Sequence, residues 1–366
     1  MKGGILVLTN FIAGLYCFRK EVMEAIVDDG YQLYISVPDT DDSRIEYFKG
    51  IGCRIIKTDF NRRGMNPIDD LRLMLKYRSI IKKLKPKAVL TYTIKPNVYG
   101  GIACRLTGTP LIANVTGLGD AIENGGWLQK LIVYLYKMGI GKAKQVYFQN
   151  PSNKEVCQRF GIADERAIVL PGSGVNLKHH IYQEYPADEV IKFLYIARLQ
   201  KDKGTGEYFE AAKAIKAKFP QTEFQVLGWK EGDYEGKLEE LVAKGVIHFL
   251  GMTSDVRPYL KDVHCTIMPS YHEGMSNVNL ESAANGRPVI TTDVPGCRET
   301  VDDGVTGILV TAKDANSLIE GVERFLAMSY EQKKQMGLEG RKKVEREFDR
   351  NIVIRAYLDA IAEVKV

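Results

Sequence analysis

Paired cysteines, clustered histidines and long apolar runs are all missing from this 366-residue sequence. Its six cysteines are dispersed without a Cys-x-x-Cys pair, and its five histidines form no cluster at metal-ligand spacing. This pattern excludes a structural zinc site and favours free thiols in a reducing compartment. No stretch approaches the ~20 apolar residues of a membrane span. The apolar run at the N-terminus is too short for a signal peptide and predicts a first buried strand.

The composition is typical of a globular enzyme, with 45% hydrophobic and 27% charged residues. The length is enough for two domains of ordinary size, each with its own core. Short apolar runs alternate with helical patterns in both halves, which predicts an α/β fold with parallel sheets covered on both faces. We expect strands at residues 5–8, 31–37, 54–57, 88–91, 111–114 and 145–149, and again at 193–197, 223–227, 247–250, 265–268, 289–292 and 308–310.

A polar, proline-containing segment at residues 178–189 separates the two series of strands and predicts a linker. We therefore expect an N-terminal domain over residues 1–182 and a second domain over residues 188–345. The final segment, residues 330–366, is strongly helical and charged, and residues 346–366 of it lie beyond the second domain.

The most informative stretch runs from residue 270 to residue 307 and contains two glutamates, Glu273 and Glu281, eight residues apart. Glu273 is expected in a loop after a strand, and Glu281 about two turns inside the following helix. A helix N-terminus between them offers backbone amides to an anion. The residues that supply these amides are Gly274, Met275, Ser276, Asn277 and Val278. One acid can then reach a sugar hydroxyl beside a diphosphate, while the other accepts two vicinal hydroxyls of a ribose.

This stretch resembles the Glu-x7-Glu signature of the retaining glycosyltransferases of family 4. Two acids alone would also fit an ordinary β-loop-α unit, but residues 286–289, Gly296, Glu299 and residues 304–307 stand at the family's spacing as well. The resemblance implies a GT-B fold, in which two Rossmann-like domains face each other across a cleft. It implies that Glu273 contacts the donor sugar and that Glu281 contacts the nucleotide ribose. It also implies that residues 346–366 form a helix that packs back on the N-terminal domain.

Two cations follow the first strand of the second domain, Arg198 and Lys203. Their segment resembles the family's Gly-Arg-Leu pattern, with Ala197 where glycine is usual. The planar guanidinium of Arg198 suits bidentate phosphate contact, and Lys203 adds a mobile charge. Two exposed cations in a loop would be unremarkable elsewhere, but open α/β sheets bind ligands in loops of this kind. We expect the pair to neutralise the departing diphosphate in place of a metal ion.

Loops of the N-terminal domain supply the candidates for donor and acceptor contact. Gly14 fits either a close approach of the backbone to a phosphate or a plain tight turn. The acceptor-side candidates follow two expected strands and are Lys95, Asn114, Thr116, Gly117, Gly119 and Asp120. Many family members have a histidine near the second of these loops, and this chain has none there. Asn114, Thr116 and Asp120 are its possible substitutes. The loops look most like those of bacterial members that extend a sugar on undecaprenyl diphosphate.

Seven basic residues and no acid lie between residues 72 and 87, which predict an amphipathic helix with a basic outer face. We expect its apolar stripe, Leu71, Met74, Leu75, Ile81 and Leu84, to pack on a sheet. The basic face fits either a solvated surface or an anionic membrane leaflet. Nucleic acid is disfavoured because no DNA-reading motif accompanies the patch. The apolar cluster at residues 127–132 fits either a core or an interfacial lipid contact.

From the resemblance we expect a metal-independent, retaining glycosyltransferase that uses a UDP-sugar and no further cofactor. The expected acceptor is a sugar on a polyprenyl diphosphate, in the assembly of a capsule, O-antigen or other glycan. The protein would then be cytoplasmic and peripheral on the inner face of the membrane. A sugar-nucleotide epimerase of the same architecture and a non-catalytic nucleotide-sugar-binding protein are the alternatives.

Overall fold

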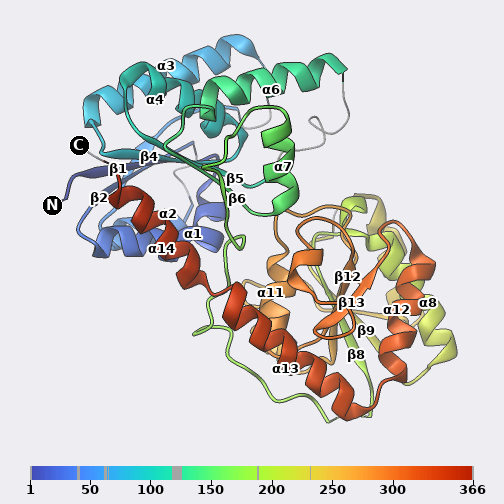
Figure 1. Cartoon of the computed structure of the whole chain (residues 1–366). Coiled ribbons are helices and arrows are strands. Elements are labelled where there is room, and N and C mark those ends of the chain that lie inside the picture. The colour runs from blue at the N-terminus through green and yellow to red at the C-terminus, as the bar shows by residue number, and fades with distance from the viewer. Residues whose placement is uncertain are drawn as a thin grey trace. The chain divides into compact units, whose positions relative to one another are not determined.

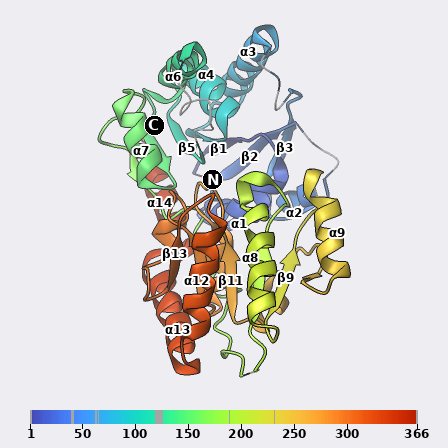
Figure 2. The ribbon, with the colours of Figure 1, turned by 90° about the vertical axis from the view of Figure 1, so that its right-hand side faces the viewer.

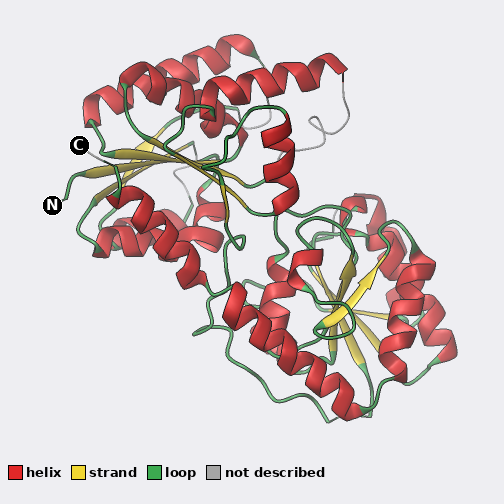
Figure 3. Cartoon of the chain, in the orientation of Figure 1, coloured by secondary structure: helices red, strands yellow, loops and turns green. Residues whose placement is uncertain are grey.

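This computed structural model describes residues 2–38, 42–61, 64, 66–117, 126–187, 189–230 and 232–364. The chain divides into two compact units. Unit 1 comprises Met1–Ser173 and Asn351–Val366, and unit 2 comprises Gly174–Arg350. Helices, strands and loops alternate through both units (Figure 3). Within the described ranges, no helix is both long and apolar enough to cross a membrane.

Unit 1 is built on a seven-stranded parallel sheet with the order β3-β2-β1-β4-β5-β6-β7. Its strands are β1 (Gly4–Leu8), β2 (Gln32–Val37), β3 (Arg54–Lys57), β4 (Ala88–Tyr92), β5 (Leu111–Val115), β6 (Gln145–Phe148) and β7 (Ile168–Val169). Every residue of β4 and β5 is buried, as expected for parallel strands covered on both faces. The first six strands confirm the prediction from apolar runs. The two-residue β7 is too short to give such a pattern.

Helices cover both faces of this sheet (Figure 1). One face carries α1 (Ile12–Asp28), α2 (Arg44–Gly50) and α14 (Arg350–Ala362), and the other carries α3 (Pro67–Leu84), α4 (Gly101–Thr107) and α6 (Gly126–Ile140). The π-helix η1 (Pro96–Gly100) precedes α4, and α7 (Pro151–Arg159) follows β6. Helix α14 contributes Val353, Tyr357 and Ile361 to the core beneath α1, so the end of the chain belongs to unit 1.

Unit 2 contains a six-stranded parallel sheet with the order β10-β9-β8-β11-β12-β13. Its strands are β8 (Lys192–Ile196), β9 (Glu223–Leu227), β10 (Ile247–Phe249), β11 (Cys265–Met268), β12 (Val289–Thr292) and β13 (Gly307–Val310). All six confirm the sequence prediction. Its helices are η2 (Lys201–Lys203), α8 (Thr205–Lys218), η3 (Gly232–Tyr234), α9 (Glu235–Ala243), α10 (Arg257–Lys261), α11 (Asn277–Ala284), η4 (Arg298–Thr300), α12 (Ala315–Ala327) and α13 (Tyr330–Glu347). Helices α8 and α12 lie side by side over one face (Figures 1 and 2).

Both sheets have the Rossmann topology, in which the first strand lies between the second and the fourth. The strand order reverses between β1 and β4 in unit 1 and between β8 and β11 in unit 2. Open α/β sheets bind ligands at the carboxyl ends of the strands beside this reversal. Arg198 and Glu273 follow the two strands that flank the reversal in unit 2.

The segment expected to be a linker, residues 178–189, contributes its described residues to unit 2. Arg287, which is fully buried, fastens it there by donating hydrogen bonds to the carbonyl groups of Gln183 and Glu184 at 3.1 and 2.7 Å. The same guanidinium donates to the carbonyl groups of Leu260 and Lys261. Arg287, which belongs to the stretch 286–289 at the family's spacing, therefore has a structural role: it holds residues 183–184 against residues 260–261.

Candidate functional site

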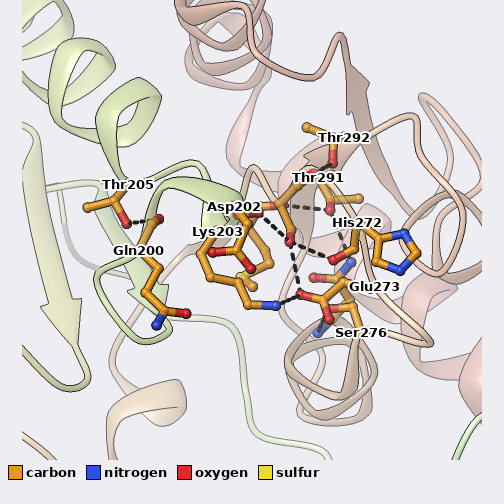
Figure 4. A network of polar contacts seen from close by, with 12 residues as sticks. Gln200, Asp202, Lys203, Thr205, His272, Glu273, Ser276, Thr291 and Thr292 are labelled. Atoms are coloured by element: carbon orange, nitrogen blue, oxygen red, sulfur yellow. Dashed lines mark hydrogen bonds and ion pairs between the residues drawn. The ribbon is translucent and has the colours of Figure 1, made fainter. Parts of the chain in front are cut away.

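Two predicted site residues, Lys203 and Glu273, meet at the carboxyl edge of the sheet in unit 2 (Figure 4). Lys203 Nζ donates to Glu273 Oε1 at 2.7 Å, and each side chain is only 17% exposed. Seventy positions separate the two residues in the chain. They meet because β8 and β11 are neighbours in the sheet. The sequence predicted both residues as site groups, but not this ion pair.

Ser270 also holds Glu273, and sequence reasoning did not assign it a role. Its hydroxyl lies 3.0 Å from Glu273 Oε1 and 3.2 Å from the carbonyl oxygens of both Asp202 and His272. Thr292 donates from its hydroxyl to the carbonyl of Ser270, which ties this residue to the end of β12. The His272 ring points away from the Lys203–Glu273 pair (Figure 4). The site therefore orients its acid through a buried hydroxyl.

Two glycines allow the site loops to pack closely. Gly204 has a φ of +66°, and a Cβ there would lie 2.0 Å from the carbonyl oxygen of Pro269. Gly296 has a φ of +82°, and a Cβ there would lie 2.3 Å from the carbonyl oxygen of Glu273. Any side chain at either position would push the loop away. These two glycines therefore fix the positions of the loops that carry Lys203 and Glu273.

Helix α11 begins directly after this loop, and Ser276 is its N-cap. The Ser276 hydroxyl accepts a hydrogen bond from the amide of Asn279 at 3.3 Å. The Ser276 amide donates to the carbonyl of Gly296 at 2.7 Å. The predicted anion-binding residues, 274–278, thus surround a helix N-terminus, where backbone amides lack intrahelical partners. The Ser276 amide differs from the prediction, because its hydrogen bond to Gly296 already engages it.

Glu281 lies on α11, about one and a half turns from its N-cap, and is half-buried. Burial raises the pKa of its carboxyl group to about 7. The positive charge of Arg350 opposes this shift and the negative charge of Asp255 adds to it. Among the described residues, no hydrogen bond or ion pair engages the carboxylate. Hydroxyl groups of a ligand would satisfy this carboxylate and stabilise its charged form.

Arg198 is exposed at the carboxyl end of β8. The backbone beside it is fixed, because the Leu199 amide donates to the carbonyl of Trp229 at 3.0 Å. Gly228 makes room for this segment, since a Cβ there would lie 1.8 Å from the carbonyl oxygen of Ala197. This contact is with the backbone of residue 197 and not with its side chain.

In unit 1, the predicted acceptor-side residue Lys95 forms an ion pair with Asp70. Lys95 Nζ lies 2.6 Å from Asp70 Oδ1, and both side chains are 12% exposed. Tyr99 donates to the other carboxylate oxygen of Asp70 at 2.7 Å. Asp70 was missed because an acid in the first turn of a helix is ordinary, and no sequence pattern links it to Lys95.

The other candidates of unit 1 differ in their surroundings. Asn114 is 1% exposed, and its amide nitrogen donates to the Tyr357 hydroxyl at 2.7 Å, which links β5 to α14. Thr116 and Gly117 are half-buried just after β5. Gly119 and Asp120 lie outside the described residues. A Cβ at Gly14 would lie 2.7 Å from the Phe11 ring, so this glycine makes room for that side chain.

The chain matches two models of glycosyltransferase domains. Residues 6–150 match the model described as "Glycosyl transferase 4-like", and residues 191–328 match "Glycosyl transferases group 1". Solved structures agree in fold. A glycosyltransferase from Rickettsia africae has a TM-score of 0.80 at 19% identity and covers 99% of this chain and 98% of its own. The Anabaena protein HepE in complex with UDP and glucose has a TM-score of 0.78 at 17% identity, covering 98% and 99%.

Two curated relatives are also similar in sequence. An N,N'-diacetylbacillosaminyl-diphospho-undecaprenol alpha-1,3-N-acetylgalactosaminyltransferase from Campylobacter jejuni is 27% identical over 96% of both chains. A UDP-Gal:alpha-D-GlcNAc-diphosphoundecaprenol alpha-1,3-galactosyltransferase from Escherichia coli is 26% identical over 72% of both chains. The fold and these matches define a glycosyltransferase of GT-B architecture. Within that class, the chain belongs to family 4.

Proposed function

We propose that this protein is a retaining glycosyltransferase that moves an N-acetylhexosamine or a hexose from a UDP-sugar to a lipid-diphosphate-linked saccharide. The observation that carries the proposal is the Lys203–Glu273 ion pair at the carboxyl edge of unit 2, with Glu281 on the adjoining helix. The names of the relatives support the acceptor class, because the proteins from Campylobacter jejuni and Escherichia coli are both named for sugars on diphospho-undecaprenol. The product would enter a capsule, an O-antigen or another surface glycan.

Each site residue has a role in this proposal. Glu281 accepts two hydroxyls of the nucleotide ribose, and Glu273 accepts a hydroxyl of the donor sugar. Arg198 and Lys203 neutralise the diphosphate as it departs, which is stabilisation of charge that develops in the transition state. An ammonium group has three donors, so Lys203 can keep its bond to Glu273 while it donates to a phosphate oxygen. Ser270 keeps the carboxylate of Glu273 in place.

Retention of configuration is proposed to follow front-face attack. The acceptor hydroxyl oxygen bonds to C1 of the donor sugar while the bond from C1 to the departing phosphate oxygen breaks. The hydroxyl proton passes to that same phosphate oxygen, so the step needs no nucleophile from the enzyme. Unit 2 contributes the two cations that lower the energy of this departing group.

On the acceptor side, Lys95 and the backbone near Gly117 are proposed to meet the lipid diphosphate. Lys95 is held by Asp70 and keeps two further donors on its ammonium group. We also propose that the protein works at the cytoplasmic face of a membrane, because a lipid-linked acceptor stays in the bilayer. The basic residues of α3 would favour an anionic leaflet by about 1 kcal/mol for each residue near the surface.

The direct test is a screen of nucleotide sugars against short polyprenyl-diphosphate sugars, with products identified by mass spectrometry. We expect one combination to give a product heavier by one sugar, together with an equal amount of free UDP. The anomeric configuration of the new bond, read by NMR, should be that of the donor. An epimerase would change the sugar and release no UDP, and a binding protein would bind the donor without turnover. Either result would overturn the proposal.

A further inference from the structure

The outer face of α3 carries apolar side chains that the sequence analysis expected in part to be buried. Ile68, Leu71 and Leu75 are 61%, 54% and 48% exposed. Their spacing of three and four residues puts them on one side of the helix. The core is filled instead by another side of α3, through Leu73, Tyr77 and Ile81. The expectation that Leu71 and Leu75 pack on the sheet is therefore wrong.

Helix α6 shows the same feature. Trp127, Leu131 and Tyr134 are 76%, 43% and 59% exposed, at a spacing of four and three residues. The cluster at residues 127–132 is thus not simply part of the core, although Ile132 packs against it. We call the six exposed side chains of α3 and α6 the apolar rim. Each helix thus exposes a stripe of three large apolar side chains, and such stripes are typical of contact surfaces.

The apolar rim lies toward one end of unit 1. Helices α3 and α6 belong to the same layer, on the face of the sheet opposite α1 and α14 (Figures 1 and 2). Helix α3 follows β3 and α6 follows β5, so both helices begin at the carboxyl edge of the parallel sheet and run back toward its amino edge. The six rim residues occupy the first part of both helices, which is the part nearest this edge. Lys95, at the carboxyl end of β4, belongs to the same edge.

The charges beside the apolar rim are mostly positive. Arg72 and Lys76 are exposed on α3, and Lys130 and Lys137 are exposed on α6. The sequence of α6 contains no acid. Of the two acids in α3, Asp70 pairs with Lys95 and Asp69 pairs with Arg72. Apolar side chains interspersed with long cations suit the boundary between lipid headgroups and acyl chains, where the cations reach the phosphates.

We propose that the apolar rim inserts into the headgroup–acyl boundary of an anionic bilayer and holds the carboxyl edge of unit 1 against the membrane. This inference rests on the proposed function only in that a lipid-linked acceptor would then reach the edge that carries Lys95. It differs from binding through the basic residues alone. Lys82, Lys83 and Lys85 lie at the other end of α3, near the amino edge of the sheet. The attachment should therefore depend on apolar contact and resist salt.

Vesicle flotation of the full chain tests the proposal without any donor or acceptor present. Vesicles of phosphatidylglycerol and phosphatidylethanolamine should bind the protein at low salt and retain most of it at 0.5 M NaCl, where charge attraction is largely screened. Replacing Leu71, Leu75, Trp127 and Tyr134 with Ser should weaken binding at least tenfold at both salt concentrations. Complete release of the wild type by salt would overturn the proposal. Equal binding of the wild type and the fourfold variant would do the same.

Two matched variants serve as controls. Leu106→Ser removes an apolar side chain that is 54% exposed on α4, in the same layer but at the opposite end, and should leave binding unchanged. Replacing Lys82, Lys83 and Lys85 with Glu should weaken binding less than the fourfold variant does. A larger loss of vesicle binding in this lysine variant than in the fourfold variant would show that the contact lies at the amino edge, and would overturn the proposal. Thermal melting and transfer to a short, soluble acceptor show whether the fourfold variant remains folded.

A spectroscopic test needs no loss of binding. The chain has two tryptophans, so Trp229→Phe leaves Trp127 as the only one. Vesicles should shift the emission of Trp127 to the blue, and brominated acyl chains should quench it. An unchanged spectrum on bound vesicles would contradict insertion.

Sedimentation velocity without lipid tests whether the apolar rim is instead an interface between two copies of the chain. A wild-type dimer that the fourfold variant turns into a monomer would show such an interface and overturn the proposal.

Discussion

At the scale of single residues, the surroundings of Glu273 show how the site prepares an acid for a sugar hydroxyl. One carboxylate oxygen receives both the Lys203 ammonium and the Ser270 hydroxyl, at 2.7 and 3.0 Å. Both groups donate to the same oxygen atom, so they fix the position of that oxygen. The close contact with Gly296 fixes the backbone of the same residue. The orientation of this carboxylate is thus set by the protein itself.

Arg198 and Glu281 should affect the kinetics in different ways. Glu281→Ala removes hydroxyl contacts made equally in the ground and transition states, so we expect mainly a higher KM for the donor. Arg198→Ala removes a charge aimed at the departing diphosphate, so kcat should fall by roughly 10²–10³. Steady-state kinetics on one donor and one acceptor measure both effects. An unchanged kcat in Arg198→Ala would rule out its role at the leaving group.

The raised pKa of Glu281 predicts that this residue lowers the stability of the fold at neutral pH while it contributes to donor binding. Burial moves this pKa from its usual 4.5 to about 7, so folding disfavours the ionised form and stability is lost as the pH rises toward and through 7. At pH 8, Glu281→Gln should be more stable than the wild type, on the order of 3 kcal/mol. Below pH 4.5 the two should be nearly equal. Urea unfolding of the wild type and the variant at several pH values measures this difference in stability. The affinity for UDP should be lower in Glu281→Gln than in the wild type.

The sequence predicted the acids and the cations of this site, but not the contacts between them. The spacing of Glu273 and Glu281 follows from a loop and a helix that are local in the chain. The pairing of Lys203 with Glu273 depends on which strands are neighbours, and strand order is not a local property. Ser270 gave no signal, because a serine at the end of a strand is common. Asp70 was missed for a similar reason.

At the scale of elements, α3 shows why periodicity located a helix but not its buried side. Its sequence has apolar residues on several sides, so more than one stripe fits a period of 3.6. The start of the helix was locally determined, because Asn66 caps it by accepting from the Ile68 amide and Pro67 follows at the first position. Burial was decided by the sheet, which packs against Leu73, Tyr77 and Ile81.

The clamp formed by Arg287 gives a prediction at this scale. Its buried guanidinium donates to carbonyl groups of residues 183–184 and 260–261, and burial lowers its pKa only to about 10, so it stays charged at pH 8. Lysine cannot reproduce a planar fork, so Arg287→Lys leaves buried carbonyl groups without donors. We expect a loss of about 3–5 kcal/mol in the free energy of unfolding. If the free energy of unfolding in urea changes by less than about 1 kcal/mol, water molecules replace the hydrogen bonds of the Arg287 guanidinium.

At the scale of the whole molecule, the two Rossmann units follow from the alternation of apolar runs and helical patterns, which located twelve of the thirteen strands. The extent of unit 1 was harder to predict from the residues alone. Tyr357 of α14 lies in its core and accepts a hydrogen bond from Asn114, more than two hundred positions earlier in the chain. Nothing in the local pattern of α14 indicates that partner, and the expectation that this helix packs back came from the family resemblance.

The last prediction concerns the reaction as a whole and its need for a metal ion. In the part of the chain that the structure describes, no group of three or more His, Cys, Asp or Glu side chains is arranged to hold a metal. Arg198 and Lys203 are proposed to neutralise the diphosphate instead. We therefore expect full activity after dialysis against EDTA, with little change on adding Mg²⁺ or Mn²⁺. Lys203→Ala, assayed in parallel, should lose activity that these ions do not restore. Loss of wild-type activity on chelation, with recovery on adding metal, would assign the neutralising charge to a metal ion and not to these two residues.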